Sequence, residues 1–396
     1  MRVSTATRPR TPRLAATLRD KESVTPLELF FDLVFVLALT QCTALMAEQP
    51  TWEGLAKALL ILAVLWWSWS GYAWLTSLVD PEEGAVRLVM FAAMAGLLIV
   101  ALCVPGAFTD EALLFAGAYG VVRIAHLALF FLTCRDDPLL RRAVFTGLTV
   151  STGVAIGLLV LASFLDGIPQ GAVWALAIAI DMGGPLFHGQ DGWRLVPGHF
   201  AERHGLIIII ALGESIVAIG IGAEGNVTAG VVIGASLGVM VAAAMWWLYF
   251  DVVALAAERR LADAAPGRER NTMARDSFSY LHLPMVAGIV LLALGLKKTL
   301  EHVEDPLKLV PAVALLGGTA LYLVAHVAFR YRNVHSFNRH RAITAVLLVA
   351  LIPVAVEVPA LATVGAVAAI LTLLIAYEVR RYAEARDRLR HQLAHG

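Results

Sequence analysis

The sequence is poor in charged residues. Only 16% of its 396 residues are Asp, Glu, Lys or Arg, against about 25% in soluble domains, while 59% are hydrophobic and the mean hydropathy is +0.74. This composition excludes a soluble enzyme and a disordered chain. The 31 Lys and Arg residues equal the 31 Asp and Glu residues, so no net basic field favours nucleic acid as a partner. We therefore expect an all-α, polytopic membrane protein.

Cysteine is scarce as well. Cys42, Cys103 and Cys134 match no spacing typical of a disulfide framework or a metal site, and we interpret them as small buried hydrophobic side chains. His199 and Glu202 are three residues apart, which is compatible with a metal site or with an interfacial polar patch. A second Glu-x-x-His motif is missing from the sequence, so we expect no metal, and we expect no cofactor.

The apolar residues lie in long runs. A membrane-spanning helix needs about 20 of them, and the sequence predicts twelve spans, which cover residues 26–46, 52–74, 85–105, 111–134, 143–165, 171–189, 203–222, 227–255, 277–297, 308–330, 341–358 and 360–380. We interpret the first run as a span and not as a removable signal peptide, because no small-residue cleavage site follows it. Pro284 and Pro353 lie inside spans and predict kinks.

The basic residues support this count. With the N-terminus in the cytoplasm and twelve crossings, 26 Lys and Arg residues fall on the cytoplasmic side and four on the other. The positive-inside rule then predicts that both termini are cytoplasmic. We expect a basic cytoplasmic N-tail (1–25) and a cytoplasmic C-tail (381–396), in the bacterial cytoplasmic (inner) membrane.

The two halves of the chain resemble each other. Trp66-Trp67 has a counterpart in Trp246-Trp247, and the Ala-His pair at His126 has one at His326. We interpret residues 26–189 and 190–380 as two six-helix repeats. Because six is even, the repeats have the same orientation and form parallel repeats.

Ionisable residues inside spans are costly and mark functional sites. Glu28 and Asp32 are four residues apart in the first span, so both carboxylates lie on one helix face and can share a proton. Glu28 is also compatible with a simple helix N-terminal charge.

Arg123 lies near the centre of the fourth span and needs a partner. Asp32 is the first candidate and Asp181 the second. A functional pair and a structural pair are both open. His126 shares a helix face with Arg123, and the symmetric placement of His126 and His326 suits a proton relay, although a lone buried histidine is more often a core residue.

Glu214 is the strongest single signal. It lies eleven residues after Arg203, about 16 Å along the helix, and so close to the bilayer midplane. Gly213 beside it predicts close approach of another backbone, an ion or a substrate. Asp251, His126, His326, Glu28 and Asp32 are all predicted at a similar depth, toward the cytoplasm. Together with Tyr280 and His282, they predict one polar cavity that is open on that side.

Two segments resemble a known family. Pro26-Leu-Glu28-Leu-Phe-Phe-Asp32 and the pair Glu202-Arg203-His204-Gly205 and Gly213-Glu214-Ser215 resemble the signatures of the bacterial low temperature requirement protein A family. The resemblance covers about residues 22–385. It implies a bacterial multi-pass inner-membrane protein and supplies no substrate. The motif positions that it carries over are Glu28, Asp32, Glu202, Arg203, Gly213 and Glu214.

These observations favour a proton-coupled transporter or permease that uses buried carboxylates. Its expected partners are protons, membrane lipids and a small-molecule or lipophilic substrate. The alternative is an intramembrane enzyme that acts on a lipid or isoprenoid by acid catalysis. The sequence has no aspartate-rich diphosphate motif and no nucleophile elbow, so we lean away from an enzyme and leave the choice open. The candidate substrate and proton site comprises Glu28, Asp32, Arg123, His126, Asp181, Glu202, Arg203, Glu214, Asp251 and His326.

Overall fold

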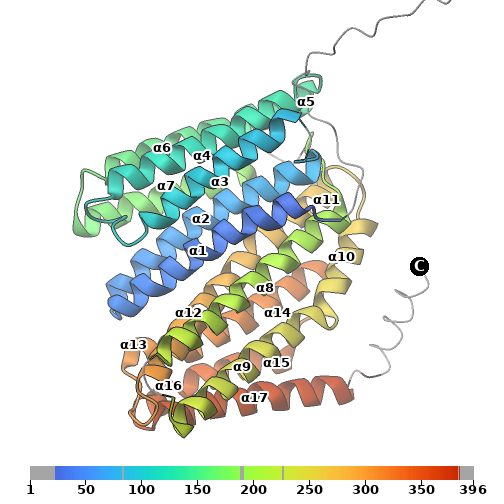
Figure 1. The fold of residues 1–396 in the computed structure, drawn as a ribbon. Coiled ribbons are helices and arrows are strands. Elements are labelled where there is room, and N and C mark those ends of the chain that lie inside the picture. The colour runs from blue at the N-terminus through green and yellow to red at the C-terminus, as the bar shows by residue number, and fades with distance from the viewer. Residues whose placement is uncertain (1–22, 83, 188–190, 225–226, 382, 384–396) are drawn as a thin grey trace, which may run out of the picture.

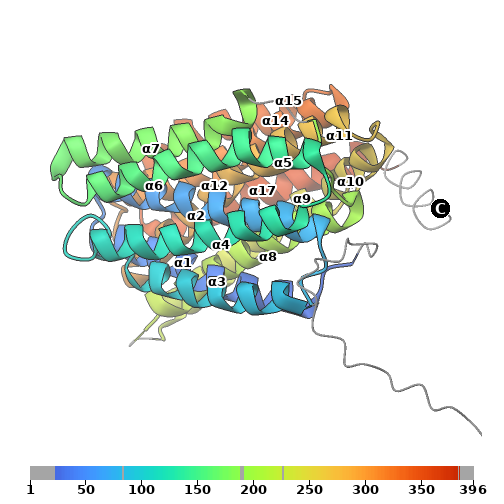
Figure 2. The ribbon, with the colours of Figure 1, turned by 90° about the horizontal axis from the view of Figure 1, so that it is seen from above.

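The computed structural model describes residues 23–82, 84–187, 191–224, 227–381 and 383. Regular secondary structure in these residues is helical, apart from one isolated bridge between Pro306 and Pro359. The long helices run in one general direction and form a bundle (Figures 1 and 2). The prediction of an all-helical architecture is confirmed.

The first half of the chain forms one side of the bundle (Figure 1). Its helices are α1 (Pro26–Glu48), α2 (Trp52–Leu78), α3 (Gly84–Leu102), α4 (Ala112–Thr133), α5 (Pro138–Val144), α6 (Val150–Ala162) and α7 (Gly167–Phe187). A π-helical segment, η1 (Phe145–Thr149), joins α5 to α6.

The second half contains more interrupted helices. They are α8 (Pro197–Gly222), α9 (Ala229–Phe250), α10 (Val253–Asp263), α11 (Arg268–Met273), α12 (His282–Glu301), α13 (Leu309–Ala312), α14 (Gly318–Val334), α15 (Arg339–Ala350), α16 (Ile352–Ala355) and α17 (Ala360–Arg381). The π-helical segments η2 (Ala274–Tyr280) and η3 (Val313–Gly317) precede α12 and α14. Breaks at Leu281 and Leu351 come just before Pro284 and Pro353, as expected because proline lacks the N–H that would continue the helical hydrogen bonds.

Within the described residues, ten helical segments, some of which contain a short break, are long and apolar enough to cross a membrane. Two of the twelve predicted spans are not among them. The apolar part of α3, at Val86–Leu102, is shorter, and the predicted span 341–358 is divided between α15 and α16. A multi-pass membrane protein is therefore supported, and the count of twelve stays a prediction.

Local sequence signals fix several helix starts. Thr25 and Glu28 form a capping box on α1, in which the Thr25 amide donates to Glu28 Oε2 at 2.9 Å. Thr51 and Thr228 cap α2 and α9 with their hydroxyl oxygens. The box at α1 also holds the Glu28 carboxyl in place, which matters for the site described below.

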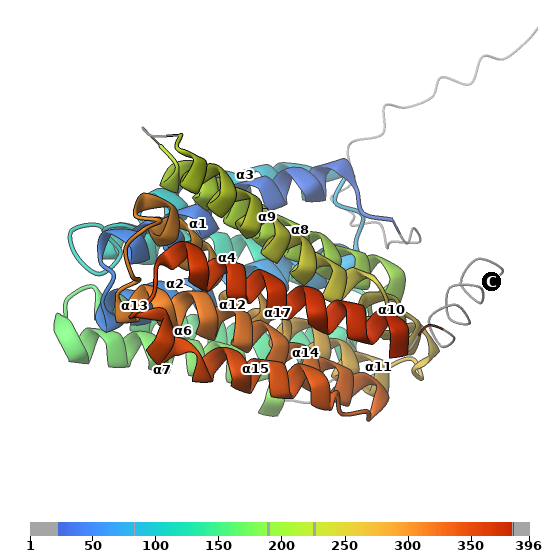
Figure 3. The same ribbon diagram turned by 90° about the horizontal axis from the view of Figure 1, so that it is seen from below.

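Helix packing follows a simple order. In the first half, α1 packs on α2 and α3, α3 on α4, α4 on α6, α6 on α7 and α7 on α2. In the second half, α8 packs on α9 and α12, α12 on α14, α14 on α15, and α9 on α17. Helices α9, α15 and α17 lie at the outer face of this half (Figure 3). Contacts of α1 and α2 with α8 and α12 join the two halves.

Glycines allow the closest of these contacts. A Cβ atom at Gly288 of α12 would lie 2.6 Å from the Gly318 carbonyl oxygen of α14, and one at Gly318 would lie 2.7 Å from the Gly288 carbonyl oxygen. Small residues let membrane helices approach backbone to backbone. These two helices are therefore fixed against each other in the centre of the second half.

Candidate functional site

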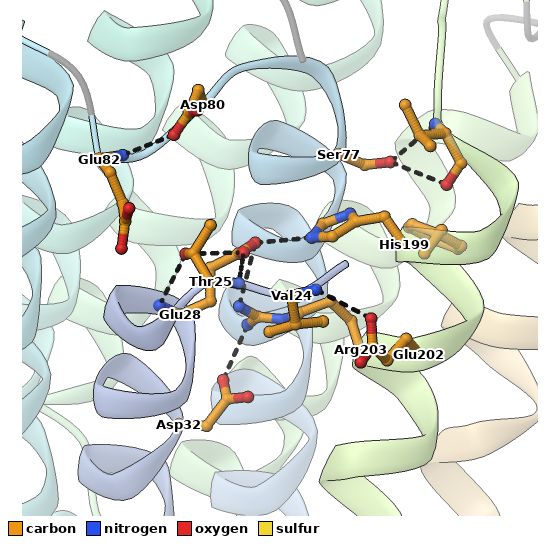
Figure 4. A network of polar contacts seen from close by, with 12 residues as sticks. Val24, Thr25, Glu28, Asp32, Ser77, Asp80, Glu82, His199, Glu202 and Arg203 are labelled. Atoms are coloured by element: carbon orange, nitrogen blue, oxygen red, sulfur yellow. Dashed lines mark hydrogen bonds and ion pairs between the residues drawn. The ribbon is translucent and has the colours of Figure 1, made fainter. Parts of the chain in front are cut away.

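A network of buried ionisable side chains joins the two halves of the chain where α1, α2 and α8 meet (Figure 4). We call it the interface network, and its members are Thr25, Glu28, Asp32, Trp69, His199 and Arg203. Helices α1 and α8 run in parallel register, because Glu28 contacts His199 and Asp32 contacts Arg203 at the same sequence separation of 171. Side chains four residues apart share a helix face, so each helix presents two of them to the other.

Glu28 accepts several contacts at once. Its Oε1 lies 2.8 Å from His199 Nε2 and 3.4 Å from Arg203 Nη1, and its Oε2 accepts from the amide and hydroxyl of Thr25. Glu28, His199 and Arg203 are fully buried. Glu28 is therefore a helix N-terminal charge that also contacts α8 through His199 and Arg203, and the sharing of a proton with Asp32 stays a prediction.

Asp32 pairs with Arg203. Its Oδ1 accepts from Arg203 Nη2 and from Trp69 Nε1, each at 2.8 Å, and the guanidinium of Arg203 lies 5.6 Å from the Trp69 ring centroid, a cation–π distance. Asp32 Oδ2 has no hydrogen-bond partner among the described residues. One buried arginine therefore serves two buried carboxylates, and one carboxylate oxygen still has room for a proton.

Glu214 lies farther along the same helix contact. It is 1% exposed, and its Oε2 accepts a short hydrogen bond from the Thr40 hydroxyl of α1. Thr43 of α1 and Lys297 of α12 also interact with it electrostatically. The carboxyl is therefore held between α1 and α8, as the interface network is, but about 16 Å beyond Arg203 along the helix.

One of the three expectations for Gly213, close approach of another backbone, is wrong. A Cβ atom placed there would meet no described atom within 4 Å, so no other backbone approaches it.

Arg123 pairs with Asp181, the second of its two candidate partners, and the first candidate, Asp32, is wrong. Arg123 Nη2 lies 3.0 Å from Asp181 Oδ2 and 2.6 Å from Thr152 Oγ1, and Tyr119 donates to Asp181 at 3.4 Å. Asp32 is not available because it pairs with Arg203 of α8. The pair links α4, α6 and α7 within the first half.

His126 and His326 lie in different surroundings. His126 is fully buried against the rings of Tyr72 and Phe130. His326 Nδ1 accepts from Arg341 Nη1 at 2.9 Å, since arginine can only donate, and Arg341 also forms an ion pair with Glu378 at 2.8 Å.

The two remaining predicted residues lie outside these buried groups. Glu202 is exposed, and its carboxylate accepts from the Val24 amide at 2.8 Å. Asp251 is half-buried at the break between α9 and α10 and lines a cavity of about 390 Å³ together with Arg330, Arg341 and Glu378.

The single shared cavity expected from the sequence is not observed. His126 and Arg123 line one cavity, Asp251 lines another, and Asp32 and Glu214 contact side chains of neighbouring helices directly. Helix packing divides the polar groups into separate clusters because Asp32, Arg123 and Glu214 each find a partner on an adjacent helix.

Several members of these clusters were not singled out from the sequence: Trp69, Thr40, Thr152, Arg341 and Glu378. Glu378 could have been found as the acid within the last apolar run. The hydroxyls and the indole have no sequence signal, because their role depends on which helices touch. In the described part of the chain, no group of three or more His, Cys, Asp or Glu side chains is arranged to hold a metal ion.

Comparisons with known proteins agree with this picture. The family model described as "Bacterial low temperature requirement A protein (LtrA)" matches residues 23–376. The chain is 31% identical over 309 residues to the uncharacterized protein RA0937 of Rhizobium meliloti (strain 1021), covering 75% of this chain and 74% of that protein. No solved structure matches the chain. The family match spans both the interface network and Glu214, and the chain belongs to the bacterial low temperature requirement A (LtrA) family.

Proposed function

We propose that this LtrA family membrane protein is a proton-coupled transporter, in which protonation of Glu214 alters the contact between α1 and α8. The observation that carries this proposal is a carboxyl group that is buried in the second half of the long apolar helix α8 and hydrogen-bonded to a hydroxyl of the other half of the chain. Intramembrane carboxyls of this kind are typical of proton relays.

The Thr40 hydroxyl gives Glu214 two distinct states. Thr40 Oγ1 lies within hydrogen-bond reach of both Glu214 Oε2 and the Val36 carbonyl oxygen, the latter at 3.2 Å. A hydroxyl has one proton to donate. When Glu214 is ionised, the Thr40 hydroxyl donates its hydrogen bond to the carboxylate. When Glu214 is protonated, the carboxyl donates to Thr40 Oγ1, and the Thr40 hydroxyl then donates to the Val36 carbonyl oxygen. Protonation therefore reverses the hydrogen bond that joins α1 to α8.

The interface network offers a second place for the proton. Glu28 and Asp32 carry two negative charges against the single positive charge of Arg203, and His199 supplies the second positive charge only when it is protonated. Because buried charges need compensation, the network favours the uptake of one proton. The interface network lies between the same two helices as Glu214, so protonation of either group would shift the equilibrium of the contact between α1 and α8.

The packing order also supports a repeat. Each main helix contact of the first half has an equivalent in the second when α1, α2, α3, α4, α6 and α7 are matched with α8, α9, α12, α14, α15 and α17. This supports the proposal of two parallel six-helix repeats, an architecture found in transporters that move one half against the other. The excess of Lys and Arg on one side supports cytoplasmic termini in the inner membrane.

Proton flux into proteoliposomes tests the proposal. Purified protein is reconstituted with a trapped pH dye and an outside-acid pH step is applied, with bacterial small-molecule extract added to supply substrate. We expect flux above that of empty vesicles, and we expect Glu214→Gln to abolish it, because the amide keeps the shape but cannot take up a proton.

The matched control is Glu224→Gln, which makes the same chemical change at an exposed residue beyond the end of α8 and should leave the flux unchanged. Equal flux through the Glu214→Gln variant and the parent, at equal reconstitution, would contradict the proposal.

A further inference from the structure

A second polar space lies away from Glu214 and the interface network, between α2, α4, α7 and η2. It has a volume of about 40 Å³, above the 10–15 Å³ or so that a single water needs. Its polar lining residues are Ser70, Arg123, His126, Arg275 and Ser279, and its aromatic walls are Trp67, Trp74, Phe130 and Trp193. None of the described residues that line it is acidic. We call it the arginine cavity.

Two residues that line the arginine cavity, Arg123 and Trp67, carry buried donors without a partner among the described residues. The hydrogen bonds that the described residues give Arg123 all use Nη2, its Nε has no partner among those residues, and Nη1 faces Gly71. Trp67 is more than nine-tenths buried, and its indole N–H finds no acceptor in the described part of the chain. An unpaired buried donor costs about 1–3 kcal/mol, so a ligand that supplies acceptors would stabilise this place.

The charges around the arginine cavity favour an acceptor that is negative. Arg123 is balanced by Asp181. On the opposite wall, however, Arg275 and Arg332 both bind the one carboxylate of Asp276, at 2.7 Å and 3.0 Å. Two arginines on one aspartate leave one positive charge in excess in this cluster, of which Arg275 lines the cavity and Arg332 is partly exposed outside it. Arginine is a common partner of bound anions, because its guanidinium is always charged and carries several hydrogen-bond donors.

We propose that the arginine cavity binds a small monovalent anion, such as a halide or a formate-sized carboxylate. Arg123 and Trp67 would donate to it, Arg275 would supply the charge, and the aromatic rings would exclude larger and more hydrated ions. The cavity lies between helices of the first half and η2 of the second, and neither Glu214 nor a member of the interface network lines it, so the inference goes beyond proton coupling and does not depend on Glu214.

Chloride-35 NMR tests the proposal, because the line broadens when chloride exchanges with a protein site. The protein is held in detergent micelles, and sodium formate, sodium nitrate and sodium gluconate are each added as competitors at equal ionic strength. We expect the protein to broaden the chloride line, and we expect nitrate or formate to reverse this excess broadening. Gluconate is too large for the cavity and should not reverse it. The stronger competitor then distinguishes an inorganic anion from a carboxylate.

Two variants place the binding in this cavity. Gly71→Ala would put a methyl group 2.8 Å from the His126 ring and 3.1 Å from Arg123 Nη1, and Trp67→Phe removes the indole donor. Both should lose most of the excess broadening. Their matched controls are Gly117→Ala, where a Cβ meets no described atom within 4 Å, and Trp246→Phe on an exposed face of α9.

The same broadening in Gly71→Ala and Trp67→Phe as in the parent would overturn the proposal. So would a parent protein with no excess broadening, since the cavity would then hold only water. Elution at the parent position in size-exclusion chromatography establishes that each variant is folded, and loss of broadening counts only for variants that pass.

Discussion

Replacing Arg203 by methionine removes the single positive side chain that serves Glu28 and Asp32. Both carboxylates and the guanidinium are fully buried, and the ion-pair distances are 3.4 Å and 2.8 Å. Breaking a buried pair from one side costs about 3–5 kcal/mol, because the remaining charge stays buried without a partner. A change of 1 kcal/mol shifts the Tm of a 150–250-residue domain by about 2–4 °C, and that of a larger chain by less, so we expect a fall of roughly 5–10 °C.

The buried cysteines provide the assay. Cys42, Cys103 and Cys134 are free and buried, and burial raises the pKa of the Cys134 thiol, which lowers its fraction of reactive thiolate at neutral pH. A maleimide dye that fluoresces on reaction with thiols therefore reports unfolding as temperature rises. The parent and Arg203→Met are compared in the same detergent at one heating rate, since unfolding of such proteins is commonly irreversible.

A compensating variant separates charge from packing. Adding Glu28→Gln and Asp32→Asn to Arg203→Met removes the uncompensated charges and should recover at least half of the lost Tm. Arg194→Met, at an exposed arginine that pairs with Asp137, should change the Tm little. The reasoning is refuted if Arg203→Met melts with the parent, or if the triple variant melts no higher than the single one.

Two further predictions concern the packing of each half. Arg123→Met and Asp181→Asn should each lower the Tm by several degrees. The double variant should lose clearly less than the sum of the two, because the second change removes the charge that the first left unpaired. Additive losses of Tm in the same dye assay would contradict the pairing. Gly288→Ala should destabilise the protein markedly, because its Cβ would lie 2.6 Å from the backbone of α14. The control Gly153→Ala, whose Cβ would have no described atom within 4 Å, should be neutral or stabilising. Equal Tm values for the two variants would contradict the close contact.

Much of the fold could be predicted from apolar runs, because lipid imposes a length on each helix. The helices α1, α2, α4 and α17 lie close to the predicted ranges. The deviations have physical causes: α9 continues into α10 past the break at Asp251, since an amphipathic helix can leave the bilayer, and α15 ends before Pro353, where proline removes an N–H.

The site was predicted less completely. Charge in an apolar run marked Glu28, Asp32, Arg123 and Glu214 as buried residues that need partners. The identity of each partner depends on which helices touch: Asp32 and Arg203 are 171 residues apart in the chain, and only the parallel register of α1 and α8 brings them together. Arg203 is the first residue of a predicted span, so its position in the sequence did not identify it as the partner of Asp32.

Isotope-edited infrared difference spectroscopy measures the protonation of Glu214 most directly. A protonated carboxyl has a C=O stretch separate from that of a carboxylate, and carbon-13 labelling of glutamate identifies it. On a pH step we expect a glutamate C=O band to appear or disappear in the parent protein, to be absent from Glu214→Gln, and to shift in Thr40→Val, which removes the hydroxyl that Glu214 contacts. An unchanged band in Glu214→Gln, or no carboxyl band on any pH step that leaves the protein folded, would contradict a proton-carrying role for this residue.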